Sequence, residues 1–392
     1  MAFTGPGGMR RCIGLAAVLL ATACAQPAGL PSGLAATLPF EHAGIADMRP
    51  AFAQRLGEEL ARRHQDPEPS RWLHHAARAA TAGPAPFAAP EGLRVLIVPG
   101  LLGDCVDDQS LPFSDGRRRA RPDSHTQGYA YLRATLGHVR ALQVPGRASS
   151  VRNAGLIAAQ LHAEALRPEV REILLIAYSK GVADTLLALD RLQGEGRLSP
   201  KVRALVSVSG AVMGTPLADG SAALYGALAP LWAVLGCPAS GGGEVRSLAT
   251  EERAGWLARH RLPPGVRTYS VVAYTARENV APALVPFFDR LSASDRRNDG
   301  QIPAGRMLLP GSRLLAEADA DHWAYVLPLA QHPNPLVRHL AASRDYPREA
   351  FLAAIVRTVI DDLRNTGAQA PPCRAGTSVC PVQALPEACA GP

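Results

Sequence analysis

Lysine is almost absent from this sequence of 392 residues. The 41 Lys and Arg residues outnumber the 34 Asp and Glu residues and give a formal charge of +7, yet lysine occurs only at Lys180 and Lys201. The basic excess is therefore arginine spread by composition, which argues against a phosphate-binding surface. The dense basic run at 117–121 has no interleaved aromatic residues, so we predict a solvated loop there and no nucleic-acid partner.

Motifs that bind cofactors are missing as well. The sequence contains no His-Glu-x-x-His pair, no Walker loop and no dinucleotide-binding glycine pattern. We therefore predict no metal and no organic cofactor.

No apolar run reaches the roughly 20 residues that a membrane-spanning helix needs. Near the N-terminus, two arginines precede a short apolar run at 13–20 and small residues follow it, which predicts a signal peptide over 1–25 and export. Residues 20–24 are similar to the bacterial lipobox, whose cysteine is lipidated. Two outcomes stay open: a periplasmic or outer-membrane lipoprotein attached to the membrane through Cys24, or cleavage after Ala23 or Ala25 and secretion.

The cysteines fit an exported chain but fix no pairing. Outside the signal peptide there are five, an odd number in a compartment that permits disulfides, so one thiol stays free or pairs between chains. These are Cys105, Cys237, Cys373, Cys380 and Cys389. The last three lie in a tail rich in proline and alanine at 367–392, where we expect a local disulfide and not a metal site.

Short apolar runs alternate with helical patterns through the middle of the chain, which predicts an α/β domain over 93–366. The expected fold has a mostly parallel central sheet with helices on both faces. Predicted strands cover 94–98, 139–144, 172–177, 202–208, 267–273 and 313–316, and predicted helices cover 127–136, 150–166, 180–192 and 348–365.

Two segments fall outside this alternation. Residues 26–92 are predicted to form an N-terminal extension and linker, with helices over 47–64 and 71–82. Residues 217–262 break the rhythm of the domain and are predicted to form a helical cap or lid above the sheet.

The most informative segment is the strand at 172–177 followed by Tyr178, Ser179, Lys180 and Gly181 and then by a helical run. This strand, sharp turn and helix is the setting of a nucleophile elbow, in which small residues two before and two after the serine let the helix pack closely. Ala177 and Gly181 meet that condition, so Ser179 is the predicted nucleophile. An ordinary serine that caps a helix is the alternative.

A serine hydroxyl needs a base, and the base needs an orienting carboxylate. Among the histidines after Ser179, His322 follows a predicted strand late in the domain, whereas His332 precedes a proline and His260 and His339 lie in arginine-rich helical stretches. His322 is therefore the predicted base.

The predicted acid is Asp299, which lies in an Asn-Asp-Gly turn between the last two predicted strands. Asp295 and Asp319 are the alternatives. Two backbone N–H groups must also stabilise an oxyanion, and we expect them from Lys180 and from Leu101, where glycine lets the chain approach the substrate.

Together these motifs resemble bacterial α/β-hydrolases of the lipase and carboxylesterase type. Residues 98–103 are similar to their oxyanion loop, although proline stands where many lipases have histidine, and 177–181, 298–300 and 214–219 are similar to other active-site segments. The resemblance covers about 93–365 and implies hydrolysis of carboxylic esters through an acyl-enzyme.

For the substrate we expect a small-molecule or lipid ester with an apolar acyl group. Tyr178, Met213 and Trp323 are expected to line the acyl site. A polyester depolymerase or an amidase with the same residues is an alternative. A non-catalytic envelope lipoprotein that keeps the fold as a scaffold is the alternative from another class.

Overall fold

Seven parallel strands form one sheet in the computed structural model, in the order β1-β7-β6-β5-β4-β2-β3. The structure describes residues 46–76, 87–101, 132–219, 243–326, 335–341, 344 and 346–367. The strands are β1 (Ala46–Asp47), β2 (Leu93–Val98), β3 (His138–Ala141), β4 (Glu172–Tyr178), β5 (Val202–Val208), β6 (Arg267–Tyr274) and β7 (Arg313–Asp319).

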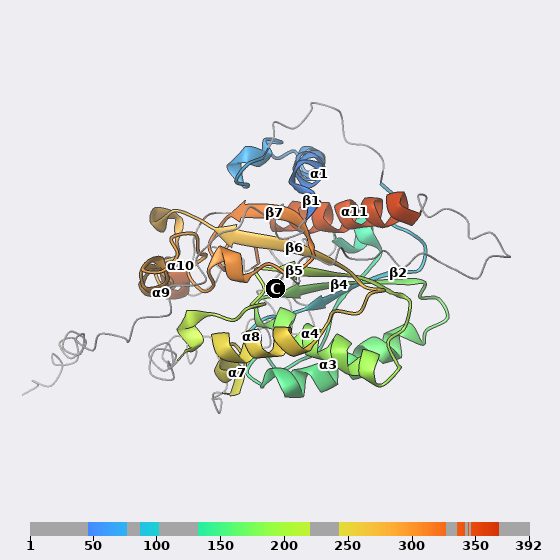
Figure 1. Cartoon of the computed structure of the whole chain (residues 1–392). Coiled ribbons are helices and arrows are strands. Elements are labelled where there is room, and N and C mark those ends of the chain that lie inside the picture. Colours follow the sequence, from blue (N-terminus) through green and yellow to red (C-terminus); the bar gives the residue numbers. More distant parts are fainter. Residues whose placement is uncertain are drawn as a thin grey trace, which may run out of the picture. The chain divides into compact units, whose positions relative to one another are not determined.

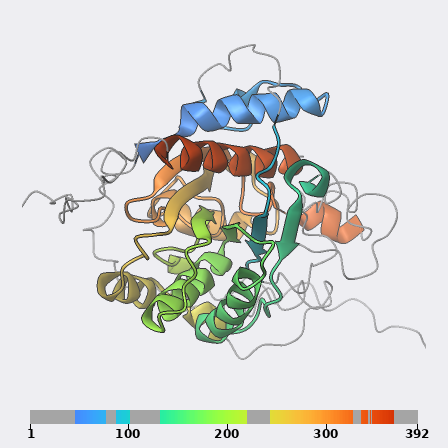
Figure 2. The same ribbon diagram turned by 90° about the vertical axis from the view of Figure 1, so that its right-hand side faces the viewer.

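Helices cover both faces of this sheet (Figures 1 and 2). The α-helices are α1 (Arg49–Arg62), α3 (Ser150–Ala165), α4 (Lys180–Gly194), α7 (Gly243–Arg246), α8 (Thr250–Arg259), α9 (Val285–Ser292), α10 (Pro335–Ala341) and α11 (Arg348–Gly367). In both views α1 and α11 lie on one side of the sheet and α3 and α4 lie on the other. This is the architecture of an α/β-hydrolase, as the sequence predicted.

Side chains of the central strands alternate between two hydrophobic cores. In β4, Leu174, Ile176 and Tyr178 pack with α1 and α11, whereas Ile173, Leu175 and Ala177 pack with α3 and α4. Successive side chains of a strand point to opposite faces, so a parallel strand covered on both faces is apolar throughout. The residue before Ser179 therefore points away from α4.

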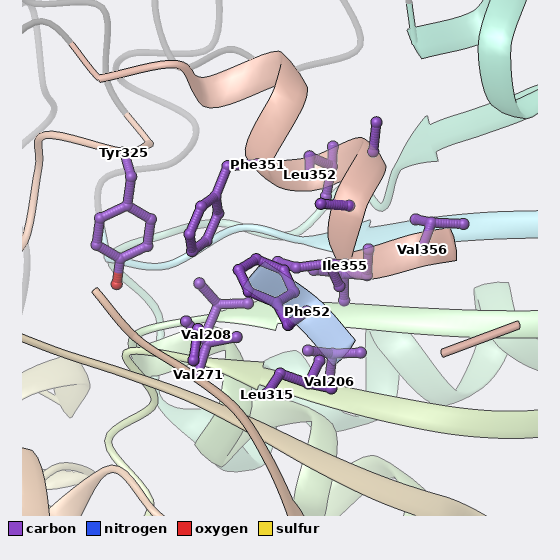
Figure 3. Packing of buried hydrophobic residues seen from close by; sticks show 14 of the residues in the cluster. Phe52, Val206, Val208, Val271, Leu315, Tyr325, Phe351, Leu352, Ile355 and Val356 are labelled. Atoms are coloured by element: carbon purple, nitrogen blue, oxygen red, sulfur yellow. The ribbon is translucent and has the colours of Figure 1, made fainter. Parts of the chain in front are cut away.

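Figure 3 shows the first of these cores. Phe52 of α1 and Phe351 of α11 meet edge to face with ring centroids 5.1 Å apart, next to the valines of β5 and β6. Aromatic pairs of this kind bury large apolar areas. They join the N-terminal helix to the last helix over the middle of the sheet.

Strand β2 lies between β3 and β4 in the sheet. The chain therefore passes from β2 to β3 on one side of β2 and then continues to β4 on the other side. In parallel sheets such a reversal opens a crevice at the carboxyl ends of the strands, where ligands bind. The chain segments that follow β2 and β4 meet at this point. They contain Gly100 and Ser179.

The structure confirms the predicted alternation and moves several boundaries. The predicted strand at 313–316 extends to Asp319, and the one at 139–144 ends at Ala141. The helix predicted over 71–82 is wrong for its described part: a 3-10 turn (η2, Pro69–Arg71) ends there, and Leu73 pairs with Ala318. Hydrogen bonds to β7 replace helical ones in this segment.

The N-terminal segment is part of the hydrolase core and not a separate extension before residue 93. Strand β1 pairs with β7 at the edge of the sheet, and the N–H of Met48 donates to the carbonyl of Leu314 at 2.8 Å. Phe52 and Leu56 of α1 are fully buried. Because α1 covers apolar surface of β7 and α11, the fold includes it.

The prediction of a cap over 217–262 is wrong for α8. Trp256 of α8 belongs to the core that α3 and α4 form over the sheet. A parallel connection from β5 to β6 needs a crossover that covers one face, and α8 supplies it. For the rest of 217–262 the cap stays a prediction, and 220–242 lie outside the described residues.

Other predictions also concern residues outside the described part of the chain. These are the signal peptide with Cys24, the basic run at 117–121, the C-terminal tail and every cysteine. Among the described residues, no helix is long and apolar enough to span a membrane.

A buried ion cluster fixes α1 on α11. Arg357 of α11 donates to the carboxylates of Glu58 (3.0 Å) and Glu59 of α1. The two carboxylates also pair with Arg55 and Arg62, respectively, at the edge of the interface. The three central side chains are nearly inaccessible, so each depends on the opposite charge.

Replacing Arg357 by Met should destabilise the fold by about 3–5 kcal/mol, because two buried carboxylates lose their central cation. Urea unfolding followed by circular dichroism measures this. The control is Arg71→Met, which removes an exposed pair with Asp66 and should cost less than about 1 kcal/mol. Equal losses in the two variants would contradict the assignment.

Candidate active site

Ser179 occupies a sharp turn between β4 and α4. Its backbone has φ 54° and ψ −124°, a conformation that residues other than glycine rarely adopt. Its N–H donates to Val208 at 3.0 Å and its carbonyl accepts from Ala211 at 3.1 Å. These bonds to the end of β5 hold the strained turn and raise the serine side chain above the sheet.

Close packing under the turn explains the glycines around it. A Cβ on Gly181 would lie 2.5 Å from the carbonyl oxygen of Pro99 and 2.7 Å from that of Val98. A Cβ on Gly100 would lie 2.9 Å from Cβ of Ser179. The helix can therefore approach β2 only because position 181 has no side chain, as the elbow motif predicts.

The side chains of Ser179, His322 and Asp299 form a continuous chain of hydrogen bonds. Oγ of Ser179 lies 2.9 Å from Nε2 of His322, and Nδ1 of His322 lies 2.6 Å from Oδ2 of Asp299. The exposed fractions are 6% for the serine, 4% for the histidine and 0% for the aspartate. The structure thus brings together the three residues that the sequence singled out.

The loop after α9 presents the Asp299 carboxylate. Oδ1 accepts hydrogen bonds from the N–H groups of Gln301 (2.9 Å) and Ile302 (2.8 Å), which leaves Oδ2 for His322. Asn298 holds the turn by donating to Ser292 and accepting from Gly300.

The alternative acids bind other partners. Oδ1 of Asp295 accepts from the N–H of Arg297, and Asp319 accepts from Thr275 and Arg344. Neither is a recorded partner of His322 in the described structure.

Asp321 shapes the loop that carries the histidine. Its carboxylate accepts from the N–H groups of Trp323 (3.0 Å), Ala324 (2.8 Å) and Ala281 (2.8 Å). The N–H of His322 itself donates to the carbonyl of Asp299 at 2.8 Å. His322 and Asp299 therefore contact each other through both side chain and main chain.

The N–H groups of Leu101 and Lys180 lie in the two chain segments that follow β2 and β4. Within the described residues neither N–H has a recorded hydrogen-bond acceptor. Lys180 is the first residue of α4, where the helix leaves its N–H groups unpaired and carries a partial positive charge. These are the two N–H groups that the sequence analysis predicted to stabilise an oxyanion.

The Lys180 side chain points beneath the turn, a placement that the sequence analysis missed. Its Nζ lies 2.8 and 2.7 Å from the two carboxylate oxygens of Asp184, and Asn153 of α3 donates to the same carboxylate. Lysine and aspartate four residues apart on a helix were the available signal. Nearby, burial lowers the pKa of Arg253 to about 10.

The residues predicted to contact substrate lie in different settings. Met213 and Leu101 are half-buried, and Trp323 is 9% exposed. Tyr178 is buried on the α11 side, and its hydroxyl donates to the carbonyl of His322. The prediction that Tyr178 lines the acyl site is therefore not supported by its placement.

The segment at 214–219 adjoins the acid loop. The Thr215 hydroxyl donates to the carbonyl of Gln301 at 2.6 Å, and its N–H donates to Leu248 at 2.9 Å. Gly214 adopts φ 71°, and a Cβ there would lie 2.5 Å from the carbonyl oxygen of Leu248, so a side chain would be strained.

Among the described residues, no three His, Cys, Asp or Glu side chains lie close enough together to bind a metal ion.

The sequence matches no family model and no curated protein. Among solved structures, it is similar to a metagenomic carboxyl esterase, MGS0156, with 32% identity, a TM-score of 0.69, and coverage of 83% of this chain and 95% of that one. The chain belongs to the α/β-hydrolases of the lipase and carboxylesterase type. The resemblance that the sequence predicted is therefore confirmed.

Two lipases are also similar to this hydrolase. For Bacillus licheniformis lipase BlEst2 in its mature form the identity is 20%, the TM-score 0.45, and the coverage 61% of this chain and 88% of that one. For lipase 1 from Pelosinus fermentans the values are 12%, 0.47, 69% and 99%.

Replacing Gly181 by Ala should destabilise the hydrolase by about 1–3 kcal/mol and reduce its activity, because the new methyl group would collide with the carbonyls of Val98 and Pro99. Gly194→Ala is the matched control at the other end of α4, where a Cβ would meet nothing within 4 Å. That change should be neutral or stabilise the helix by up to about 1 kcal/mol. Thermal unfolding of both variants tests the packing, and a stable, fully active Gly181→Ala protein would contradict it.

Proposed function

We propose that the protein hydrolyses carboxylic esters through an acyl-enzyme formed on Ser179. The observation that carries this proposal is the chain of short hydrogen bonds from Ser179 through His322 to Asp299. Family membership supports ester hydrolysis, since the similar structure at 32% identity is a carboxyl esterase.

His322 acts as the base in this proposal. The Nδ1–H of His322 donates a hydrogen bond to Asp299, so Nε2 is left with a free lone pair directed at the serine hydroxyl. As Oγ attacks the ester carbonyl carbon, its proton moves to Nε2. The imidazolium then protonates the leaving alkoxide, and the alcohol departs.

A water molecule reverses these roles in the second half of the reaction. His322 takes a proton from the water, the hydroxide attacks the acyl carbon, and Oγ of Ser179 leaves with the proton from Nε2. The products are the acid and the regenerated serine. Asp299 stays ionised and stabilises the imidazolium in both halves.

The N–H groups of Leu101 and Lys180 would stabilise the oxyanion of both tetrahedral intermediates. Fixed donors beside a buried serine act in a site with little water, where they stabilise developing charge strongly. Preorganised donors of this kind also need no rearrangement during the reaction.

For the substrate we propose a small-molecule or lipid ester with an apolar acyl group, contacted by Leu101, Met213 and Trp323. Polyesters and amides would undergo the same chemical steps. A panel of esters with rising acyl length, a polyester and an amide separates these substrates.

We further propose that the chain is exported, on the basis of the charged and apolar pattern over 1–25. Lipidation at Cys24 would attach it to a membrane, whereas cleavage at a neighbouring alanine would release it.

Ser179→Ala and His322→Ala should each lower kcat on p-nitrophenyl esters by about a thousandfold or more, and Asp299→Asn by less. A fluorophosphonate probe should label the wild type and fail to label Ser179→Ala. The control is His260→Ala. His260 directly follows α8 and pairs with Asp190 near the end of α4 that lies away from Ser179. Replacing His260 should therefore leave kcat unchanged. Wild-type activity in Ser179→Ala would refute the proposed function.

A further inference from the structure

Two buried tyrosine hydroxyls hold the loop that carries His322. Tyr178 donates to the main-chain carbonyl of His322 itself, and Tyr325, three residues further along, donates to the Ser209 hydroxyl at the end of β5. Both tyrosines are at most 5% exposed. The loop is therefore tied to two neighbouring central strands.

Strand geometry explains how the residue before the nucleophile reaches the base. Ala177 faces α4, so Tyr178 faces the opposite side of the sheet, where the His322 loop passes. The rings of Tyr178 and His322 have centroids 5.0 Å apart and are tilted by 35°. The two side chains therefore pack against each other besides sharing the hydrogen bond.

The main-chain N–H and carbonyl of His322 both form hydrogen bonds within the site. Its N–H donates to the carbonyl of Asp299, and its carbonyl accepts from the residue next to Ser179. Burial raises the pKa of the Tyr178 hydroxyl well above its ordinary value, so the group stays protonated and remains a donor.

We propose that Tyr178 is a positioning residue that sets the distance between Nε2 of His322 and Oγ of Ser179. The inference rests on the proposed function, since it requires that these two atoms react. An imidazole displaced by about 1 Å can lower the rate of proton transfer by up to a hundredfold. The Tyr178 hydroxyl binds the main chain of His322, so it acts through the placement of the imidazole.

The loop keeps other supports when the Tyr178 hydroxyl is lost. Asp321 accepts hydrogen bonds from the N–H groups of Trp323 and Ala324 in the loop and from that of Ala281. Arg348 donates to the carbonyl of Ala324 at 3.2 Å. Tyr178→Phe should therefore fold and leave the imidazole less well aligned.

The experiment compares Tyr178→Phe with Tyr346→Phe in the full chain. Tyr346 is 3% exposed and donates to the main-chain carbonyl of Trp72 at 2.7 Å. Each variant therefore loses one hydrogen bond from a buried tyrosine hydroxyl to a main-chain carbonyl. Tyr178→Phe should lower kcat on p-nitrophenyl esters about 10- to 100-fold with KM within about twofold. Its rate of labelling by a fluorophosphonate should fall by the same factor, while Tyr346→Phe should keep both rates.

A second measurement separates positioning from a general loss of structure. In a His322→Ala background, Tyr178→Phe should cause no further loss in the labelling rate, because the residue acts through the imidazole. Unchanged kcat in Tyr178→Phe, or an equal loss in both backgrounds, would overturn the inference. If Ser179→Ala and His322→Ala abolish activity while Tyr178→Phe does not change it, only this inference fails and the proposed function stands.

Discussion

The backbone at Ser179 is held at φ 54° between a buried strand and a buried helix, and the rest of the site depends on this turn. Such a conformation is unfavourable for serine and persists only where the surroundings determine it. Here β2, β5 and α4 do so through Gly181, through hydrogen bonds to Val208 and Ala211, and through the Lys180–Asp184 pair. The strained turn places the hydroxyl at the carboxyl ends of the strands, 2.9 Å from Nε2 of His322.

The order of the strands then decides which segments can reach that hydroxyl. The reversal at β2 brings Gly100 and Leu101 beside the turn, and the loops after α9 and β7 bring the carboxylate and the imidazole from the other side. Each loop is fixed by its own main-chain hydrogen bonds, through Asp299 and Asp321. Described elements thus hold the side chains of Ser179, His322 and Asp299 in place, as catalysis by preorganised groups would require.

The sequence predicted the central strands, the elbow and the three triad residues because each has a local signal. An apolar run before Ser179, a small residue at position 181 and a turn at 298–300 can be recognised without the fold. Contacts between distant segments have no such signal. The packing of α1 on α11 through Glu58, Glu59 and Arg357, the bond from Tyr178 to His322 and the core position of α8 all join parts of the chain that only the folded sheet brings together.

The central claim is that Oγ of Ser179 attacks the ester and carries the acyl group. Rapid mixing with a p-nitrophenyl ester, an acid quench after a few milliseconds and peptide mapping by mass spectrometry test it most directly. If Ser179 is the nucleophile, each chain should carry one acyl group on Ser179, and p-nitrophenol should be released at least as early as the acyl group appears. Turnover with the acyl group on another residue would contradict it.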